Sequence, residues 1–238
     1  MNTNKNLFAL THTSKKLSLL GLSAFFLLGS HVTTAFASDD ATLEEKMVRV
    51  LVKGNIAQVE NLIKQGMTLD KDLNGDGTPL IIAAQRGNLK LTQFLLNQGA
   101  DINQSSPQDG TPLIAAVQSE NLQLVRYLIE QGAEINLAKV PDGNPFIAAA
   151  LSNNLAIVKY LHQQGANIDA IVEHDETALI SASRAGHFQV VKYLVEQGAD
   201  VNLAVEAQTV RGKELRSPLN GAKTSKIRDY LLQHGARS

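Results

Sequence analysis

A Gln-Gly pair recurs every 33 residues along most of the chain, with its glycine at Gly66, Gly99, Gly132, Gly165 and Gly198. Alanine follows the last four of these glycines, and an aromatic residue lies five residues before each of the same four. Self-similarity at a fixed period of this length indicates an array of structural repeats, each of which buries its apolar face against its neighbours. The 238 residues are therefore expected to form one linear stack rather than two globular domains.

The composition fits a core made mainly of aliphatic side chains. Apolar residues make up 44% of the chain but aromatic residues only 5%, and tryptophan and cysteine are absent. The aromatic positions before the periodic glycines (Phe94, Tyr127, Tyr160, Tyr193 and, in the last unit, Tyr230) are interpreted as packing positions rather than as a ligand-stacking surface. Disulfide bonds and thiol chemistry are excluded.

The N-terminus predicts export. Three lysines, Lys5, Lys15 and Lys16, precede an apolar run at residues 17–28, and small residues at Ala35 and Ala37 match the pattern read by a signal peptidase. We expect cleavage before Ser38, which removes residues 1–37 as a Sec-type signal peptide and delivers the protein to a bacterial periplasm. An uncleaved anchor is the alternative, but the run is short against the ~20 residues that a spanning helix needs.

Removal of that segment changes the charge balance. It takes away three lysines and no acidic residue, so 19 Lys and Arg remain against 23 Asp and Glu, a net charge of −4. A protein with this balance is not expected to bind nucleic acid generically. No second apolar stretch is long enough to span a bilayer, so we expect no membrane contact after cleavage.

The pattern within each unit predicts two helices. Thr42 and Glu45 form a capping box before the first apolar helical pattern. Later units open with Thr-Pro-Leu-Ile or a variant of it, in which the residue before proline caps the helix and proline takes the first helical position. The expected domain covers residues 38–238, with repeats at about 42–73, 74–108, 109–141, 142–174, 175–216 and 217–238.

Short polar breaks divide the helices of a unit. The first helix is expected to end at Gly87, Asn153 or Gly186, which tolerate a left-handed backbone, whereas Glu120 at the same position departs from the pattern. Caps for the second helix are expected at the next residue, which is Asn88, Asn121, Asn154 or His187.

The combination of Thr-Pro-Leu, paired alanines, Gly-Asn or Gly-His, Leu-Leu and Gly-Ala-Asp-Ile-Asn at this period resembles the ankyrin repeat, over residues 42 to 238. The resemblance implies an all-α solenoid of about six helix-pair repeats with short β-hairpin fingers. It also implies that partners are bound by the finger tips and by the exposed ends of the first helices, which line a concave side.

The chain departs from the family pattern in three places. Isoleucine replaces the usual histidine after Thr-Pro-Leu, at Ile81, Ile114, Ile147 and Ile180. Aspartate takes the hairpin-turn position that the family usually gives to glycine, at Asp76, Asp109, Asp142 and Asp175, and is expected to accept its left-handed backbone. The fifth finger carries seven extra residues before Ser217, followed by a shortened first helix.

No motif predicts catalysis, a metal or a cofactor. Asp72, Asn74, Asp76 and Gly77 match half of a calcium loop, but the position that needs a bidentate glutamate is Ala83, which favours an acidic turn. The aspartates of successive repeats are expected about 8–10 Å apart, too far to share a proton. We predict a protein that is not an enzyme and that binds no cofactor.

The residues predicted to contact a partner are those that change freely between copies. On the first helices they are Gln85, Arg86, Gln118, Ser119, Leu151, Ser152, Arg184 and Ala185; on the fingers they are Ser106, Lys139, Val140, Val172, His174, Arg211, Lys213 and Arg216. Some apolar finger residues, Val140 and Ile171 among them, have the alternative of packing finger against finger. The insert before Ser217 is either a partner-specific loop or an excursion without function.

These expectations converge on a monomeric, non-catalytic scaffold that binds another protein in the periplasm. Two alternatives remain open. The protein is a secreted effector or inhibitor that acts on a host or competitor target, or it is similar to exported ankyrin proteins that support a periplasmic catalase or a related oxidative defence. The sequence does not identify the partner.

Overall fold

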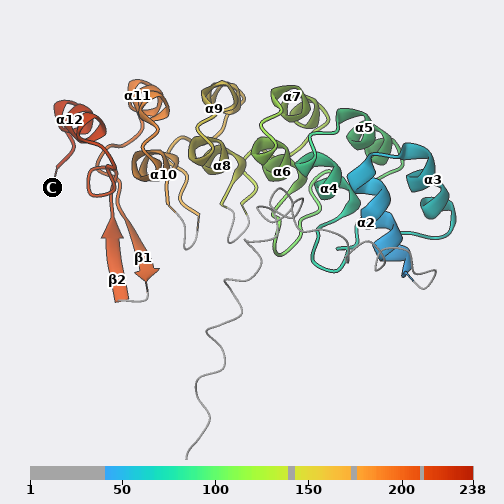
Figure 1. The fold of residues 1–238 in the computed structure, drawn as a ribbon. Helices are drawn as coiled ribbons and strands as arrows, with labels where there is room; N and C mark the ends of the chain where they lie inside the picture. Colours follow the sequence, from blue (N-terminus) through green and yellow to red (C-terminus); the bar gives the residue numbers. More distant parts are fainter. Residues whose placement is uncertain (1–40, 139–142, 173–175, 210–211, 238) are drawn as a thin grey trace, which may run out of the picture. The chain divides into compact units, whose positions relative to one another are not determined.

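The computed structural model describes residues 41–138, 143–172, 176–209 and 212–237. Thr42–Ser238 form one unit, and Met1–Ala41 form another, of which only Ala41 is described. The described part of Thr42–Ser238 holds eleven helices and one two-stranded sheet, which confirms the predicted helical repeat fold (Figure 1). None of these helices has the length and apolar character needed to cross a membrane.

The helices come in pairs that follow one another along the unit, and the first helix of a pair contacts the first helix of the next (Figure 1). The pairs are α2 (Leu43–Lys53) with α3 (Ile56–Lys64), α4 (Pro79–Gln85) with α5 (Leu89–Asn97), α6 (Pro112–Gln118) with α7 (Leu122–Glu130), α8 (Pro145–Leu151) with α9 (Leu155–Gln163), and α10 (Ala178–Ala185) with α11 (Phe188–Glu196). A last helix, α12 (Ser225–Gln233), follows the sheet.

The starts of the first helices are built as predicted. The side chains of Thr78, Thr111, Asn144 and Thr177 each accept a hydrogen bond from the N–H three residues later, at 2.9–3.3 Å. Proline at the first helical position of α4, α6 and α8 loses no hydrogen bond, because the N–H of any other residue at this position would have no partner within the helix. The capping box at Thr42 is also present.

The breaks between paired helices have one backbone geometry. Gly87, Asn153 and Gly186 have positive φ angles as predicted, and Glu120 adopts the same conformation at φ 59°. The fold therefore imposes a left-handed residue here even where the sequence supplies glutamate, at a steric cost that glycine would avoid.

The predicted cap at His187 is wrong. Asn88, Asn121 and Asn154 accept from the N–H three residues later at 3.1–3.2 Å, but His187 makes no side-chain cap. Its Nε2 instead lies 2.9 Å from the carbonyl oxygen of Leu151 in the preceding repeat. The larger ring reaches past its own helix start to a neighbouring element.

Equivalent apolar positions form the core. Leu80, Leu113, Phe146 and Leu179 are at most 1% exposed, and the isoleucines after them, at 81, 114, 147 and 180, are at most 3% exposed. These isoleucines give the apolar packing between repeats that was expected where the family places histidine. Alanines in the middle of the first helices are also buried and let neighbouring helices approach closely.

A series of side-chain to backbone hydrogen bonds joins successive repeats of Thr42–Ser238. The side-chain oxygens of Asp70, Asn103, Asn136, Asp169 and Asn202 accept from the backbone N–H groups of Asp101, Glu134, Asn167, Asp200 and Arg237 in the next repeat, at 2.8–3.0 Å. The acceptors are themselves 33 residues apart. Each repeat therefore fixes the backbone of its successor after the periodic glycine.

The fingers differ from the expected β-hairpins. In the described residues only the fifth finger forms strands, β1 (Val205–Thr209) and β2 (Gly212–Arg216), while the second finger has a single bridge between Ser106 and Gly110. Asp76 and Asp109 do not take the left-handed conformation, which falls on Gly77 and Gly110 instead. Asp142 and Asp175 lie outside the described residues.

The last unit departs further from the pattern. A shortened first helix was predicted after Ser217, but the structure has a turn there, closed by the Gly221 N–H to the Ser217 carbonyl at 3.0 Å. The Lys223 N–H then donates to the Ser183 carbonyl of α10 at 3.0 Å. Backbone bonding to the preceding repeat thus replaces the helix.

Candidate functional site

The C-terminal ends of the first helices bring together the predicted first-helix contacts. We call the residues at these ends the first-helix row: Val52, Lys53, Gln85, Arg86, Gln118, Ser119, Leu151, Ser152, Arg184 and Ala185. They occupy two equivalent positions of five repeats, and neighbouring first helices are in contact. The fold therefore places them in one line.

Several members of the row face solvent. Val52 is 43% and Leu151 58% exposed, and Arg86 and Gln118 are exposed as well. Leu51, Val117 and Ala150, which precede Val52, Gln118 and Leu151, are buried, whereas the leucine at the end of α8 lies outside the core.

Other members of the row have partners inside the protein. The Gln85 Nε2 donates to Oδ1 of Asp109 in the next finger at 3.1 Å. The hydroxyls of Ser119 and Ser152 donate to carbonyls of their own helices, at 2.7 and 2.9 Å. These three side chains contribute to the fold as well as to the surface.

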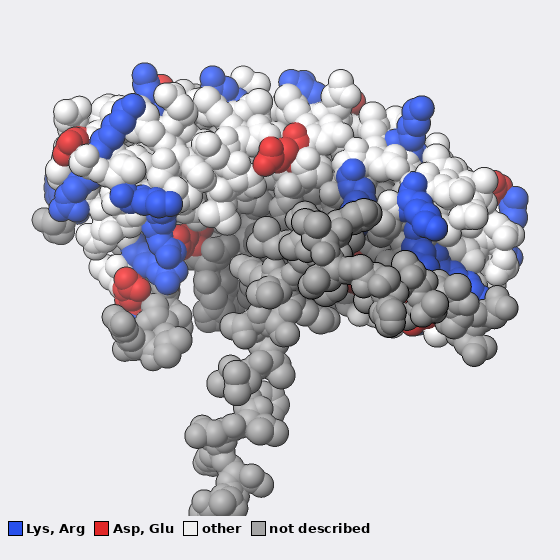
Figure 2. All heavy atoms as spheres, viewed as in Figure 1, with Lys and Arg blue, Asp and Glu red and all other residues white. Residues whose placement is uncertain are grey.

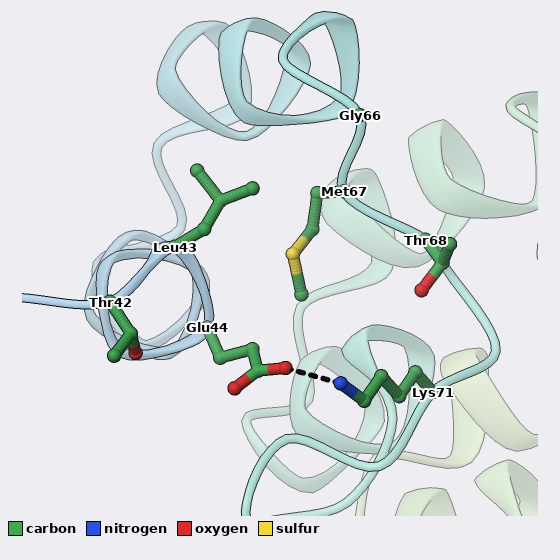
Figure 3. Close-up of a pocket in the computed structure, with 7 residues that line it drawn as sticks. All are labelled: Thr42, Leu43, Glu44, Gly66, Met67, Thr68 and Lys71. Carbon is green, nitrogen blue, oxygen red and sulfur yellow. Dashed lines mark hydrogen bonds and ion pairs between the residues drawn. The ribbon is translucent and has the colours of Figure 1, made fainter.

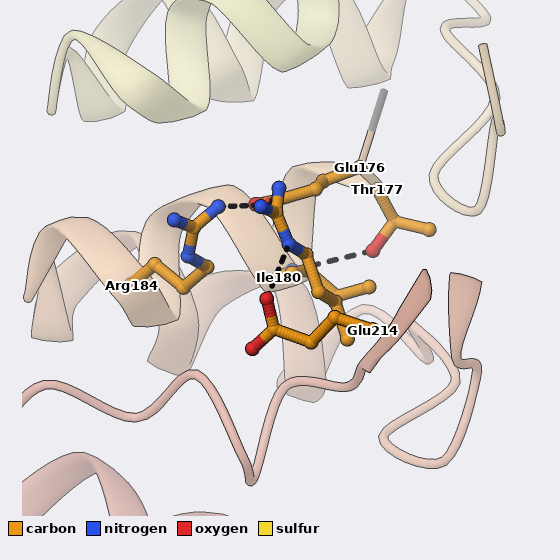
Figure 4. A network of polar contacts seen from close by, with 6 residues as sticks. Glu176, Thr177, Ile180, Arg184 and Glu214 are labelled. Atoms are coloured by element: carbon orange, nitrogen blue, oxygen red, sulfur yellow. Dashed lines mark hydrogen bonds and ion pairs between the residues drawn. The ribbon is translucent and has the colours of Figure 1, made fainter. Parts of the chain in front are cut away.

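Arg184 and Arg216, both predicted as partner contacts, form an ion-pair network with Glu176 (Figure 4). Nη1 of each arginine contacts Oε1 of this buried glutamate, and Arg216 also lies 3.8 Å from Glu214. Arg184 additionally packs against Gly221, where a Cβ atom would meet its side chain at 2.5 Å. The two arginines therefore neutralise a buried carboxylate, a structural role that the sequence did not predict.

Two predicted finger contacts are not on the surface. Ser106 is 2% exposed and donates to Oδ2 of Asp72 at 2.5 Å, which joins two successive fingers. Val172 is 6% exposed and belongs to the apolar core. The expectation that they are exposed is wrong, because Ser106 bonds to the preceding finger and Val172 packs into the apolar core.

The remaining predicted finger residues divide in two. Lys139, Val140, His174 and Arg211 lie outside the described residues. Lys213 is exposed on β2 and pairs with Glu206 of β1 at 2.9 Å. Ile171 is 55% exposed, so the alternative that it packs against a neighbouring finger does not hold.

Two shallow hollows lie at the ends of the described stack. One, of about 460 Å³, is lined by residues of the α2 start and the first finger, across which Glu44 and Lys71 pair (Figure 3). The hydrogen bond from Lys71 and its charge lower the pKa of Glu44. The other, of about 570 Å³, includes Leu215 and Arg237. Both are open, so neither encloses a reaction site.

The acidic turns have structural partners. Asp72 accepts from the Gly75 N–H as well as from Ser106, so both of its oxygens serve the turn in which a calcium loop was considered. Burial, together with the charges of Asp72 and Asp76, raises the pKa of Asp109, against the hydrogen bonds of Gln85 and Ser106. Within the described residues, no three histidine or acidic side chains gather as a metal site would require.

The aromatic column packs between repeats, with contacts that sequence reasoning missed. The Arg126 guanidinium lies 4.3 Å from the ring centre of Tyr160, and the Lys159 ammonium 5.6 Å from that of Tyr193. The Tyr193 hydroxyl is also 3.0 Å from Nδ1 of His162. A basic residue 34 positions before an aromatic one is the sequence signal that could have predicted these cation–π pairs.

Charge is unevenly spread on the face shown in Figure 2. Lysine and arginine gather over α2 and α4 and again around α12 and the hairpin, while the described surface between them is mostly uncharged. No continuous basic stripe of the kind that tracks a nucleic-acid backbone is visible there.

Comparison with known proteins gives the family. The model for ankyrin repeats in three copies matches residues 46–139 and 138–205. The crystal structure of the human ASB11 ankyrin repeat domain is similar, with a TM-score of 0.65, 25% sequence identity, and coverage of 80% of this chain and 84% of that domain. No curated protein sequence matches the chain.

The repeats are a known scaffold for binding other proteins rather than a catalytic fold, and their match spans well over half of the sequence. Together with the paired helices and their periodic caps, this places the chain in the ankyrin repeat family.

Proposed function

We propose that the protein is an exported, non-catalytic scaffold that binds a partner protein in the periplasm along the first-helix row. One observation carries the proposal. The row changes from Val52 through Gln85, Gln118 and Leu151 to Arg184, while the buried positions beside it hold small or apolar residues in every repeat, with Ser181 and Ser183 of α10 as the polar ones. Binding an irregular partner surface requires exposed side chains that differ from repeat to repeat, held on a backbone and core that do not.

The exposed part of the row defines the contacts. Arg86 supplies a charge that donates hydrogen bonds, Gln118 a neutral polar group, and Leu151 an apolar anchor. Arginine at interfaces commonly contributes more than its share of the binding energy. Arg184 is left out of this set because it neutralises Glu176.

Export is supported by the N-terminal pattern of lysines, apolar run and small residues. Export of this kind would bring the scaffold to the periplasm, where the partner is to be sought. N-terminal sequencing of the protein purified from a periplasmic fraction should begin at Ser38; recovery from the culture medium would favour the effector alternative.

The binding test uses a double substitution in the row, Arg86→Glu with Leu151→Lys. Capture of the partner that the unchanged protein retains from periplasmic extract, identified by mass spectrometry, should fall about tenfold or more, since both changes fall at contact positions. The melting temperature should stay unchanged because both side chains are exposed.

The matched control is Lys90→Glu with Ala156→Lys, which makes the same kinds of change at exposed positions of the second helices. It should retain the partner. Equal losses in both variants, or full capture by the row variant, would remove the row from the binding surface. Arg184→Glu is unsuitable as a probe, because it would set a second carboxylate against Glu176 and destabilise the fold.

A further inference from the structure

The fifth finger carries a hairpin that the repeat pattern does not require. It is longer than the second finger by seven residues, and it forms β1 and β2 with antiparallel pairing from Val205–Arg216 to Thr209–Gly212. Among the described residues, no third strand pairs with either of its outer edges. Unpaired edges of this kind are templates for strand addition.

The hairpin is held firmly despite its size. Isolated two-stranded hairpins are marginal in water, but here Val205 is buried and Arg216 contacts Glu176, which also binds Arg184 of α10 (Figure 4). These contacts fix one face of the hairpin against the repeat. The outer edge of β2 is therefore presented in a defined position, which lowers the entropy cost of pairing.

The opposite face of β2 exposes an apolar side chain. Leu215 is 60% exposed, the highest fraction among the large apolar residues of the described chain, and it borders the hollow that Arg237 also lines. Its cross-strand neighbour is Glu206, which pairs with Lys213 on the same face. Leu215 is therefore the exposed apolar side chain on an edge strand whose neighbouring residues Lys213, Glu214 and Arg216 carry charge.

The order of charges along β2 selects one register for pairing with itself. Two residues directly opposite each other in adjacent strands lie on the same face of the sheet. A two-fold axis perpendicular to the sheet keeps each residue on its own face. The axis must therefore run midway between one residue of β2 and the same residue of the second copy, which lie directly opposite each other. Centring it on Lys213, Glu214 or Arg216 would set like charges against each other, which is unfavourable.

Only the register centred on Leu215 avoids this repulsion within Lys213–Arg216. It opposes Leu215 to Leu215 of the second copy and places Glu214 opposite Arg216 twice, once on each side of the axis. Lys213 then meets Ser217. Each copy contributes the same patch, so the contact closes as a dimer rather than extending into a filament.

We propose that β2 pairs antiparallel with β2 of a second copy of this chain, centred on Leu215, to form a four-stranded sheet across the dimer. This self-association replaces the monomer expected from the sequence. It goes beyond the proposed partner binding and uses no residue of the exposed first-helix row. The small contact makes it a weak, concentration-dependent association.

Cysteine substitution tests the geometry directly, because the chain has no cysteine of its own. In the purified full-length chain, Leu215→Cys should form a disulfide-linked dimer on mild oxidation, since opposed residues lie about 4.5–5.5 Å apart at Cβ. Lys213→Cys and Glu206→Cys are matched controls on the same face. Their symmetry mates would lie roughly 13 Å or more away, beyond the reach of a disulfide.

Sedimentation of the cysteine-free chain, from about 1 μM to 1 mM, gives the second measurement. The average mass should rise with concentration, and Leu215→Lys should weaken association about tenfold or more while leaving the melting temperature unchanged. Equal cross-linking of all three cysteine variants, or a monomer at every concentration, would overturn the proposal. Neither result bears on partner capture by the first-helix row.

Discussion

The carboxyl group of Asp109 shows how single residues join neighbouring repeats. Oδ1 accepts from Gln85 of the preceding repeat, and Oδ2 lies 3.4 Å from the Ser106 hydroxyl. Burial, the dominant effect, raises its pKa above the ordinary value of 3.8, and the nearby carboxylates of Asp72 and Asp76 act in the same direction. The native protein therefore holds the proton of this group more tightly than the unfolded chain does.

The sign of the resulting pH dependence follows from this difference. Because the native state binds more protons here, stability falls as the pH rises from about 3.8 through the raised pKa of Asp109. Asp109→Asn keeps an oxygen for Gln85 and removes the ionisation. In denaturant titrations, the free energy of unfolding of the unsubstituted protein should fall relative to that of Asp109→Asn as the pH rises over this range. A difference between the two proteins that does not vary with pH would contradict a raised pKa for Asp109.

Residue identity predicted the caps well but predicted exposure poorly. Thr78 and Asn88 cap through bonds within three residues, which a local pattern contains. Ser106 and Val172 were expected to be exposed because they lie in fingers, but Ser106 bonds to Asp72 of the preceding finger and Val172 belongs to the apolar core. The bond between Ser106 and Asp72 joins residues about one repeat apart, which no local pattern specifies.

At the scale of elements, the starts of the second helices offer a natural comparison. Four of them, α3, α5, α7 and α9, begin with a capping asparagine, whereas α11 begins with His187, which contacts the Leu151 carbonyl instead of its own helix. The N–H that Asn88, Asn121 and Asn154 satisfy in the other repeats therefore has no side-chain cap in α11. A cap of this kind contributes about 1 kcal/mol.

His187→Asn should stabilise the protein by about 0.5–1 kcal/mol, less any loss from the contact with Leu151. The reverse change at the equivalent site, Asn154→His, should destabilise it by a similar amount. Thermal unfolding of both variants measures the two effects. A lower melting temperature for His187→Asn would mean that the bond between repeats outweighs the missing cap.

The whole unit behaves as a row of neighbours rather than as one central core. Ala149 of α8 is fully buried between the first helices on either side, which α8 contacts directly. In such an array stability is close to a sum of repeat and interface contributions. A disturbance at one repeat should therefore act mainly on its neighbours.

Ala149→Leu should overpack both flanking interfaces and cost about 1–3 kcal/mol or more. Hydrogen exchange followed by mass spectrometry should show lost protection in α6, α8 and α10, with α2 least affected. Ala156→Leu, at an exposed position of α9 in the same repeat, is the matched control and should change little. Uniform loss of protection along the unit would contradict the nearest-neighbour description.

The sequence by itself determined the repeat, its period, the helix pairs and their caps, because each depends on contacts within a few residues or on equivalent positions one period apart. Tertiary structure alone decided the rest. It made Arg184 and Arg216 partners of buried Glu176, confined the strands of the described residues to the fifth finger and set a turn where a helix was expected. These outcomes depend on which charges and apolar groups non-equivalent segments bring together, and in this chain those segments break the period.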